Sequence, residues 1–322
     1  MRRREATLAL AALGGLLPTI AVAEAYPDHG LRLIVPYPPG ASTDAVGRQV
    51  AQKMSESLGK NIVVENLGGA SGNIGSDYVA KSKPDGYTFL LGTDATHSAN
   101  MHLLANPPFD PVKDFTPLTL AAMNPIVLVV HPSVPANNLR ELVAYVRANP
   151  DRGSYGSSGI GSPHHLAGEL LHQRTGAAFV HVPYRGGGPA LNDVMGGQIP
   201  MIFASVITVL QHIRAGKLRA IATTQTTRYE GLPDVPTMAE TLEGFDMSSW
   251  LGFLGPAHLP DAVARRLSEE VIKSLNDPEV KAKLVAGGLV VVASSAASFA
   301  SQIRRDFDLR GKLIEQAGIK AE

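Results

Sequence analysis

The stretch "VPYPPGASTDAVG" at 35–47 ends a short apolar run, breaks at Pro-Pro-Gly, and then offers Ser, Thr and Asp before helical spacing begins. The chain repeats this arrangement at 182–197 as "VPYRGGGPALNDVMGG". The first N–H groups of a helix have no partner within it, and the helix dipole places partial positive charge there. A glycine-rich turn between a strand and a helix opens those donors to a ligand. Both stretches therefore predict a site for an anion.

Each turn combines small residues that leave the helix start open with residues suited to a first helical turn. The small residues are Gly40, Ala41, Gly186, Gly187 and Gly188. The candidates to cap the first helix or to face a ligand are Ser42, Thr43 and Asp44. Pro189 is expected at the first position of the second helix, where its missing N–H has no cost.

A third candidate turn is "SSGIGSPHHLAGELL" at 157–171. Here Ser162 is expected to cap a helix that Pro163 opens, with Leu166 and Leu170 facing the core. The alternative for all three turns is an ordinary strand–helix connection, in which Ser and Pro serve only as caps.

The patterns around these glycines argue against a nucleotide phosphate. A Walker loop needs Lys after its last glycine, and neither Gly40 nor Gly188 is followed by one. The Rossmann pattern fails because Leu191 stands where its last glycine is required. Neutral donors suit a small carboxylate. One helix start contributes about 0.3–1 kcal/mol, whereas micromolar affinity needs about 8 kcal/mol, so several starts, hydrogen bonds and domain closure must act together.

Length and charge set the protein class. A chain of 322 residues is expected to form two domains. Lys+Arg and Asp+Glu both number 29, and there is a single Trp, so we expect no nucleic-acid partner. The chain has no Cys, which excludes thiol nucleophiles and Cys metal sites.

The first 25 residues have the layout of an export signal: a basic start, an apolar stretch, and small residues. We expect cleavage near Ala23 or Ala25. The consecutive arginines leave twin-arginine export open as an alternative to the general route. The apolar stretch is shorter than the roughly 20 residues that span a bilayer, so a membrane anchor is disfavoured.

From Leu31 onward, strand-like and helix-like segments alternate, which is typical of sheets flanked by helices. The expected strands are 31–37, 61–66, 87–93, 125–132, 178–184, 199–205, 218–224 and 250–256. The clearest expected helices are those with apolar stripes at 46–58 and 139–146, and those at 163–176, 261–276 and 299–318.

The sequence partly matches two other kinds of site, a hydrolase and a zinc site. An α/β hydrolase acting on a small ester needs a G-x-S-x-G turn, but Ile160 and Asn73 stand where the two nearest matches require glycine. His165 and Glu169 lie one helical turn apart and offer half a zinc site, but there is no H-E-x-x-H pattern. We therefore expect no catalytic residue, no metal and no cofactor.

Several motifs in order resemble one family. They are "VPYPPGASTD", "VVENLGGASGNIGSDYVAKSKPDGYTFLLGT", "VHVPYRGGGPALNDVMGGQIPMIF", "AGKLRAIATT" and "DVPTMAE…SSWLGFLGPAHLP". The chain is similar to the Bug-type (TctC-like) extracytoplasmic solute receptors of tripartite tricarboxylate transporters. The resemblance covers almost the whole chain after the export signal.

The resemblance implies an α/β fold: a two-lobed periplasmic binding protein (type II-like), each lobe a mixed sheet flanked by helices, with a two-strand hinge. Lobe 1 is then expected at 26–126 plus 248–322 and lobe 2 at 127–247, with 125–132 and 248–256 crossing between them. The lobes are expected to close around a small carboxylate, such as an organic acid or acidic amino acid.

The resemblance also implies the binding residues. In lobe 1 they are Tyr37, Pro38, Gly40, Ala41, Thr43 and Asp44, with Thr93 and His97 nearby. In lobe 2 they are Ser158, Gly161, Ser162, Gly186, Gly187, Gly188 and Ala190. Asp193 is expected to brace its loop without touching the anion.

The chain departs from the family pattern at the cleft. Ala41 stands where a second Gly is common, and Ala204-Ser205 replaces a frequent Asp-Asn. A relative's ligand therefore does not transfer directly. We expect a monomeric periplasmic receptor whose partners are the carboxylate and a membrane permease of the tripartite tricarboxylate type.

Overall fold

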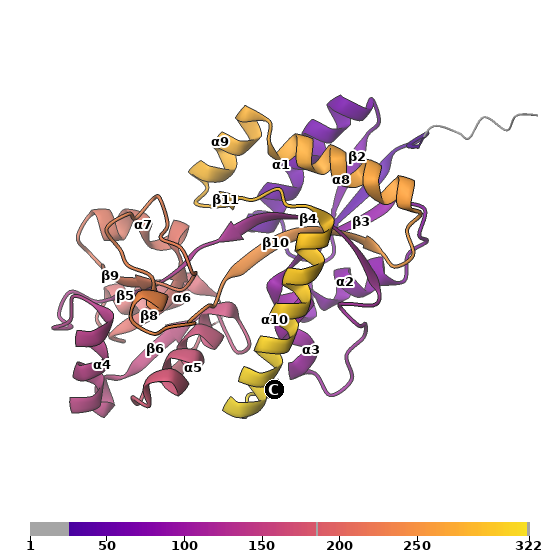
Figure 1. Cartoon of the computed structure of the whole chain (residues 1–322). Helices are drawn as coiled ribbons and strands as arrows, with labels where there is room; N and C mark the ends of the chain where they lie inside the picture. Colours follow the sequence, from indigo (N-terminus) through magenta and orange to yellow (C-terminus); the bar gives the residue numbers. More distant parts are fainter. Residues whose placement is uncertain (1–25, 185, 321–322) are drawn as a thin grey trace, which may run out of the picture.

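The computed structural model describes residues 26–184 and 186–320, so the predicted export signal at 1–25 lies outside the described residues. Two mixed β-sheets, each flanked by helices, form the fold (Figure 1). This arrangement confirms the predicted α/β class. We call the part built on the six-stranded sheet lobe 1 and the part built on the five-stranded sheet lobe 2. Within the described ranges, no helix combines the length and apolar character needed to cross a membrane.

Lobe 1 contains a sheet with strand order β11-β4-β10-β3-β1-β2. Its strands are β1 (Leu31–Val35), β2 (Ile62–Asn66), β3 (Thr88–Thr93), β4 (Phe115–Asn124), β10 (Ser249–Pro256) and β11 (Val290–Val291). Its helical elements are α1 (Ser42–Leu58), η1 (Ala70–Gly72), α2 (Asn73–Ala80), η2 (Ala95–Ala99), α3 (Asn100–Leu103), α8 (Asp261–Leu275), α9 (Pro278–Ala286) and α10 (Ala296–Ala317). Strand β1 is parallel to β2 and β3, and β10 is antiparallel to β3 and β4.

The side chains of β1 alternate between two apolar cores, one on each face of the sheet. Leu33 and Val35 pack with α1, α8 and α9, whereas Ile34 packs with α2, α3 and α10. Because both faces are covered, the strand is a continuous apolar run in the sequence. Val46 and Val50 are fully buried in the first core, as the apolar stripe of this helix predicts.

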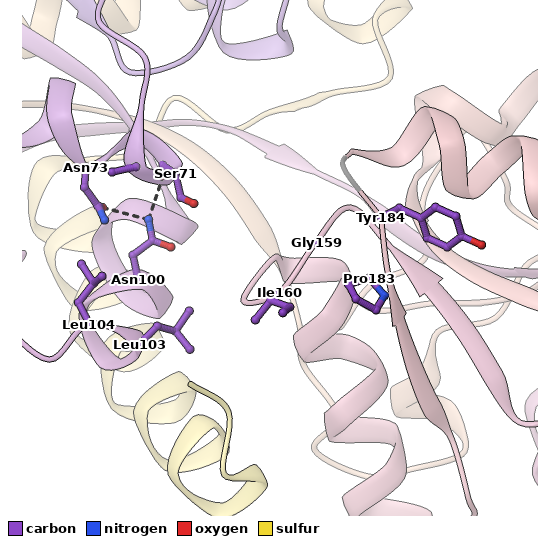
Figure 2. A pocket seen from close by; sticks show the side chains of 10 residues that line it. Ser71, Asn73, Asn100, Leu103, Leu104, Gly159, Ile160, Pro183 and Tyr184 are labelled. Atoms are coloured by element: carbon purple, nitrogen blue, oxygen red, sulfur yellow. Dashed lines mark hydrogen bonds between the residues drawn. The ribbon is translucent and has the colours of Figure 1, made fainter. Parts of the chain in front are cut away.

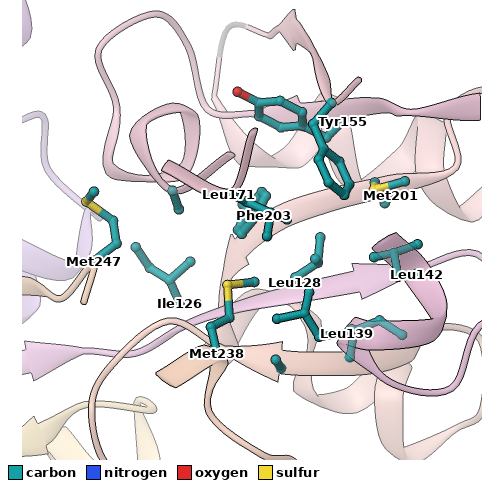
Figure 3. Close-up of a cluster of buried hydrophobic side chains, with 14 of the residues drawn as sticks. Ile126, Leu128, Leu139, Leu142, Tyr155, Leu171, Met201, Phe203, Met238 and Met247 are labelled. Carbon is teal, nitrogen blue, oxygen red and sulfur yellow. The ribbon is translucent and has the colours of Figure 1, made fainter. Parts of the chain in front are cut away.

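Lobe 2 contains a sheet with strand order β7-β6-β8-β5-β9. Its strands are β5 (Ile126–Val130), β6 (Ser154–Ser157), β7 (Val180–Pro183), β8 (Met201–Ser205) and β9 (Arg219–Thr223). Its helical elements are α4 (Leu139–Ala148), η3 (Pro150–Arg152), α5 (Pro163–Thr175), α6 (Gly187–Met195), α7 (Val206–Arg214) and η4 (Met238–Glu240). Figure 3 shows the core between this sheet and α4 and α5, in which Leu128, Leu142, Tyr155 and Phe203 are fully or almost fully buried.

Strands β4 and β10 lie side by side and join the two lobes (Figure 1). Asn124, the last residue of β4, pairs with Ser249, the first residue of β10. The predicted crossings at 125–132 and 248–256 are too long, because β5 pairs only within the lobe 2 sheet and β10 only within the lobe 1 sheet. Each crossing is confined to a few residues around Pro125 and before Ser249.

Strands β4, β6 and β11 are absent from the predicted set, and one predicted helix position is wrong. Strand β4 was not expected, because Pro117 and the mixture of Thr and Ala in "FTPLTLAAMN" conceal its strand pattern. The pairing of β4 with β10 is irregular beside Pro117, where the ladder register shifts. Helix α6 begins at Gly187, so Pro189 is its third residue and not its first.

His97 lies in the core of lobe 1, which corrects its predicted place at the ligand. Its side chain is fully buried, and its ring packs edge-on against Phe115, with ring centres 4.6 Å apart. Its Nδ1 lies 2.9 Å from Thr96 Oγ1. Burial lowers the pKa of His97 to about 3, so the ring is neutral in the folded protein.

A second buried group ties the hinge to α10. Arg310 Nη1 lies 2.8 Å from Asp94 Oδ2, and both side chains are almost fully buried. Arg310 also donates to the carbonyl of Ser248. Asp94 accepts from Ser249 Oγ at 2.9 Å and from the backbone N–H of Trp250 at 3.3 Å. This pair therefore fixes the start of β10 against the long C-terminal helix.

The depressed pKa of His97 predicts a pH-dependent stability. The unfolded chain has an ordinary His pKa near 6.5, so between about pH 3 and 6.5 it binds a proton that the folded chain does not. The free energy of unfolding should therefore fall as pH drops through this window, by about 1.4 kcal/mol per pH unit from this residue. Urea unfolding from pH 7 to 5 should show a shallower dependence for His97→Gln. If the free energy of unfolding changes equally with pH in the parent protein and in His97→Gln, the lowered pKa is wrongly assigned to His97.

Removal of Arg310 should strongly destabilise the fold. Arg310→Leu leaves the buried carboxylate of Asp94 without its counter-charge, which typically costs about 3–5 kcal/mol. The matched control is Lys283→Met, which removes a cation whose pairing with Glu279 is exposed. Urea midpoints should drop markedly for the first variant and hardly for the second. Equal midpoints would show that the buried pair does not hold the hinge strand.

Candidate functional site

A cavity of about 460 Å3 lies between the two lobes. From lobe 1 it is lined by Ala70, Ser71, Asn73, Asn100, Leu103 and Leu104. From lobe 2 it is lined by Gly159, Ile160, Pro183 and Tyr184. Figure 2 shows the two groups facing each other, with the ring of Tyr184 pointing away from the space between them. Elements from both halves of the chain therefore form one cleft.

The lobe 1 wall contains an unusual backbone turn. Ala70 and Ser71 have φ values of 46° and 55°, a left-handed conformation that residues other than glycine rarely adopt. Asn100 Nδ2 holds this turn by donating to the Ser71 carbonyl at 2.9 Å and to Asn73 Oδ1 at 3.0 Å. Local strain of this kind is concentrated at functional sites, which supports a role for this wall.

Tyr37 and Thr93 connect the first predicted turn to this wall. The Tyr37 hydroxyl lies 3.0 Å from Thr93 Oγ1, and it donates to the carbonyl of Ser71 at 3.4 Å. Burial raises the pKa of Tyr37 to about 12, so its hydroxyl is neutral at physiological pH. The structure thus brings these two predicted residues together beside the cavity, although neither contributes to its lining.

The Gly40 N–H and the Asp44 carboxylate bind each other, so neither group is available to a ligand, whereas the backbone N–H of Asp44 belongs to the first turn of α1. The Gly40 N–H donates to Asp44 Oδ2 at 3.0 Å. Asp44 also accepts from Arg48 Nε at 3.1 Å and from Asn66 Nδ2 at 2.9 Å. Burial raises the pKa of Asp44, but these hydrogen bonds outweigh it and hold the pKa below its usual value. The carboxylate stays ionised and braces the turn.

The start of α1 nevertheless keeps available donors. Ala41 precedes the helix with extended dihedrals, and no described side chain caps the N-terminus. Thr43 is almost fully buried, and its Oγ1 has no hydrogen-bond partner among the described residues. Pro38 is exposed, and its carbonyl accepts from the Ala41 N–H at 3.3 Å. The first-turn N–H groups and one hydroxyl therefore remain for an anion.

The start of α6 has the same character in lobe 2. Gly186 has a φ of 101°, and its N–H donates to the Ser158 carbonyl at 3.3 Å. No described side chain caps the helix. An added Cβ at Gly187 or Gly188 would meet nothing within 4 Å, so the space around these residues is open. Ala190 is buried and packs against Gly156, which corrects its predicted ligand contact.

The third turn is closed by its own side chains. Ser162 caps α5 by accepting from the His165 N–H at 3.2 Å, and the Gly161 N–H donates to His165 Nδ1 at 3.0 Å. A Cβ at Gly161 would lie 2.2 Å from Leu103 Cδ1, so the lobes touch here. These contacts correct the predicted ligand roles of Gly161 and Ser162. Among the described residues, no three His, Asp or Glu side chains are arranged to hold a metal ion.

A hydrogen-bonded chain links the lobe 2 wall to the hinge. Ser158 Oγ lies 2.7 Å from His164 Nδ1, and His164 Nε2 lies 3.4 Å from Ser205 Oγ. Ser205 Oγ also accepts from Asn124 Nδ2 at 3.1 Å. Burial lowers the pKa of His164 to about 4, so the neutral ring donates through one nitrogen and accepts through the other. Ser158 therefore positions the cleft loop relative to the end of β4.

None of the residues predicted from the sequence to bind the ligand is among those that line the cavity. Asn100 and Leu103 carry no motif, and Ile160 lies in the third candidate turn but was not predicted to bind, because the place of these residues depends on how the lobes approach. The glycine-rich run at 68–73 was a usable signal, since it contains the left-handed turn of the lobe 1 wall. Asp193 was correctly expected to brace its loop, because it accepts from the Tyr184 hydroxyl at 2.7 Å.

Two solved structures are similar to this chain throughout its length. Rpa4515 from R. palustris, solved with adipate, is 32% identical with a TM-score of 0.79, covering 92% of this chain and 99% of that one. MatC (Rpa3494) from Rhodopseudomonas palustris, solved with bound malate, is 28% identical with a TM-score of 0.75, covering 90% of this chain and 100% of that one.

Sequence comparison gives the same result. Protein BugT of Bordetella pertussis is 33% identical over 321 residues, which is 98% of each chain. The family described as the tripartite tricarboxylate transporter family receptor (TctC) matches residues 46–319. The match runs from within α1 into the residues just after α10 and so includes every strand except β1, and the resemblance noted in the sequence is confirmed. The chain belongs to the TctC family of tripartite tricarboxylate transporter receptors.

Proposed function

We propose that this protein is a periplasmic receptor that closes its two lobes around a small carboxylate. The observation that carries the proposal is the pair of helix starts, α1 in lobe 1 and α6 in lobe 2, that no described side chain caps. The two helices belong to different lobes. The turn before α1 contacts the lobe 1 wall through the hydrogen bond from Tyr37 to Ser71, and the turn before α6 contacts the lobe 2 wall through the hydrogen bond from Gly186 to Ser158. The adipate and malate in two related structures support this class of ligand.

A dicarboxylate would bridge the lobes. One carboxylate accepts from the first-turn N–H groups of α1 and from Thr43 Oγ1, and the other accepts from Gly187 and Gly188. Hydrogen bonds to a charged group contribute about 1.5–3 kcal/mol each, so a few from each lobe reach the roughly 8 kcal/mol of micromolar affinity. Because the ligand contacts both lobes only when they approach, binding shifts the population towards the closed state.

The cavity lining suits a short organic acid. Leu103, Leu104 and Ile160 provide apolar walls for a carbon chain, and Asn100 provides an amide. None of the described lining residues is a cation. Neutral donors hold an anion without a fixed counter-charge, which suits a receptor that must release its ligand.

The proposal also includes export of the protein, the bounds of its lobes and its membrane partner. Cleavage near Ala23 or Ala25 releases a monomeric protein with lobe 1 at 26–126 plus 248–322 and lobe 2 at 127–247. The receptor then delivers its ligand to a permease of the tripartite tricarboxylate type, with no cofactor and no catalysis. Ser158 and His164 do not form a hydrolase triad, because the second nitrogen of His164 faces Ser205 and not a carboxylate.

Substitution of Gly187 tests the α6 contact. Gly187→Pro removes one N–H while keeping the helix, since proline is tolerated at a first helical position. Loss of one hydrogen bond to a carboxylate should raise the dissociation constant for malate or adipate about tenfold to a hundredfold in calorimetry.

Gly187→Ala is the matched control, because it keeps the N–H and places its Cβ in open space. It should bind as the parent protein does. If the proline variant binds whichever acid the parent binds with unchanged affinity, α6 does not hold the ligand. If neither acid nor a wider panel of organic acids shifts the melting temperature of the parent, the receptor proposal itself fails.

A further inference from the structure

A second cavity, larger than the first, lies on the other side of the hinge. Its volume is about 820 Å3. Its walls are α7 and the segment 225–231 in lobe 2, and α9 with β11 in lobe 1. Asn124, Pro125, Ser248 and Ser249 of the hinge also line it. We call this cavity the rear groove.

The rear groove is separate from the cleft described above. The two cavities share no lining residue. The cleft borders β7, at one edge of the lobe 2 sheet, whereas the rear groove follows β9, at the opposite edge. Figure 1 shows α7 and α9 above the hinge strands and α3 and α5 below them.

Apolar side chains gather on the walls of the rear groove. Ile207 on α7, Val285 on α9 and Val290 on β11 are 38%, 49% and 39% exposed, which is unusual for large apolar residues. Leu210 and Leu289 extend the same walls. A clustered apolar surface within a cavity is typical of a site that buries an apolar ligand.

Unpaired cations lie on both walls. Arg214 at the end of α7 and Lys281 on α9 line the groove, and neither has an ion-pair partner among the described residues. By contrast, Arg228 is held by Glu240, with its Nε 2.8 Å from Oε1. Glu230 is the one carboxylate in the described lining. Two unpaired cations and one carboxylate leave a single positive charge, which suits a monoanion.

One buried polar atom in the groove also lacks a partner. Gln225 Oε1 is inaccessible to solvent and accepts no hydrogen bond from the described residues. A buried acceptor without a partner costs free energy, and because a carboxylate has no hydrogen to donate, a water that accompanies the ligand is the donor that this acceptor requires. Gln225 lies just after β9 and is the first residue of the segment 225–231 that also carries Glu230.

We propose that the rear groove is a second binding site, specific for a monocarboxylate with an apolar chain. The carboxylate lies between Arg214 and Lys281, and the chain lies along Ile207, Leu210 and Val285. The volume is within the range of about 300–1,000 Å3 that small-molecule sites occupy. Glu230 repels a second carboxylate, so the specificity differs from that proposed for the cleft.

The position of the groove couples it to the hinge. An added Cβ at Gly288 in lobe 1 would lie 2.6 Å from Ile207 Cβ in lobe 2, so the lobes also touch behind the hinge. Rotation of the lobes about the hinge strands changes the distance between the walls of the cleft and also the distance between the walls of the rear groove. A ligand in the rear groove therefore changes the affinity of the cleft, and the reverse change has the same factor by linkage.

Three ligands with eight carbons test the site: octanoate, its neutral amide octanamide, and the dicarboxylate suberate. Calorimetry with the purified protein, in saturating malate to occupy the cleft, should show one saturable octanoate site. Octanamide and suberate should bind about tenfold or more weakly, because the first lacks the charge and the second brings an extra one to Glu230. Absence of saturable octanoate binding, or equal binding of all three, would overturn the proposal.

Variants locate the site. Arg214→Gln combined with Lys281→Gln should weaken octanoate binding about tenfold or more, since both charged partners are lost. Lys283→Gln is the matched control on the same helix, because Lys283 pairs with Glu279. Measured without malate, octanoate binding should be the same for Gly187→Pro as for the parent protein, even though this variant binds malate more weakly, which separates this proposal from that of the cleft. If Gly187→Pro weakens octanoate binding and the Arg214→Gln, Lys281→Gln variant does not, octanoate binds in the cleft and not in the rear groove.

Calorimetry also measures the coupling between the rear groove and the cleft. Octanoate should change the dissociation constant of malate, and malate should change that of octanoate by the same factor. Independent binding of the two acids would show that the groove does not sense the hinge and would overturn this part of the inference.

Discussion

The backbone N–H groups at the starts of α1 and α6 are the feature on which the cleft depends. Helices α4, α5, α9 and α10 are capped by Asn, Ser, Asp and Ser side chains, whereas α2, α3, α7 and α8 have no side-chain cap, so what distinguishes α1 and α6 is the open, small-residue turn before each helix and not the missing cap alone. At α1 and α6, small residues stand at the cap positions instead. An uncapped start is stable in water, but it becomes a strong anion site once closure removes the water. We expect the ligand to accept the hydrogen bonds that no side chain accepts at these two helix starts.

The scaffold keeps these starts rigid while the lobes move. Asp44 holds the first turn through Gly40 and Arg48, and Asp193 holds the second through Tyr184. Neither carboxylate is free to repel an anion, because each is occupied by donors of its own turn. The chain passes between the lobes at the end of β4 and at the start of β10, which are paired with each other. The buried pair of Asp94 and Arg310 fixes the start of β10 against α10. The C-terminal part of α10 also packs into the lobe 2 core through Leu313 and Ile314, which limits how far the lobes separate.

Local patterns in the sequence predicted the strands with continuous apolar runs and the helices with a clear apolar stripe, because each pattern depends on neighbours in the chain. Strand β4 was missed because Pro117 interrupts its pattern, and only pairing with the distant β10 makes it a strand. The same limit applies to the site. Gly161 and Ser162 were assigned to a ligand from sequence, but the Gly161 N–H donates to the His165 ring and Ser162 Oγ accepts from the His165 backbone N–H. His97 follows a strand as a ligand residue does, yet it packs against Phe115 from a later strand. Contacts between distant segments decided each of these cases.

The most direct measurement of the central claim is an amide NMR titration of the 15N-labelled protein with malate or adipate, whichever binds. The account predicts saturable shifts with one dissociation constant for the amides at 42–44 and at 187–188, since both helix starts donate to the same ligand. Amides at the capped starts of α4 and α9 should not move. Shifts at only one of the two lobes, or at neither helix start, would contradict the claim that the two helices hold the carboxylate together.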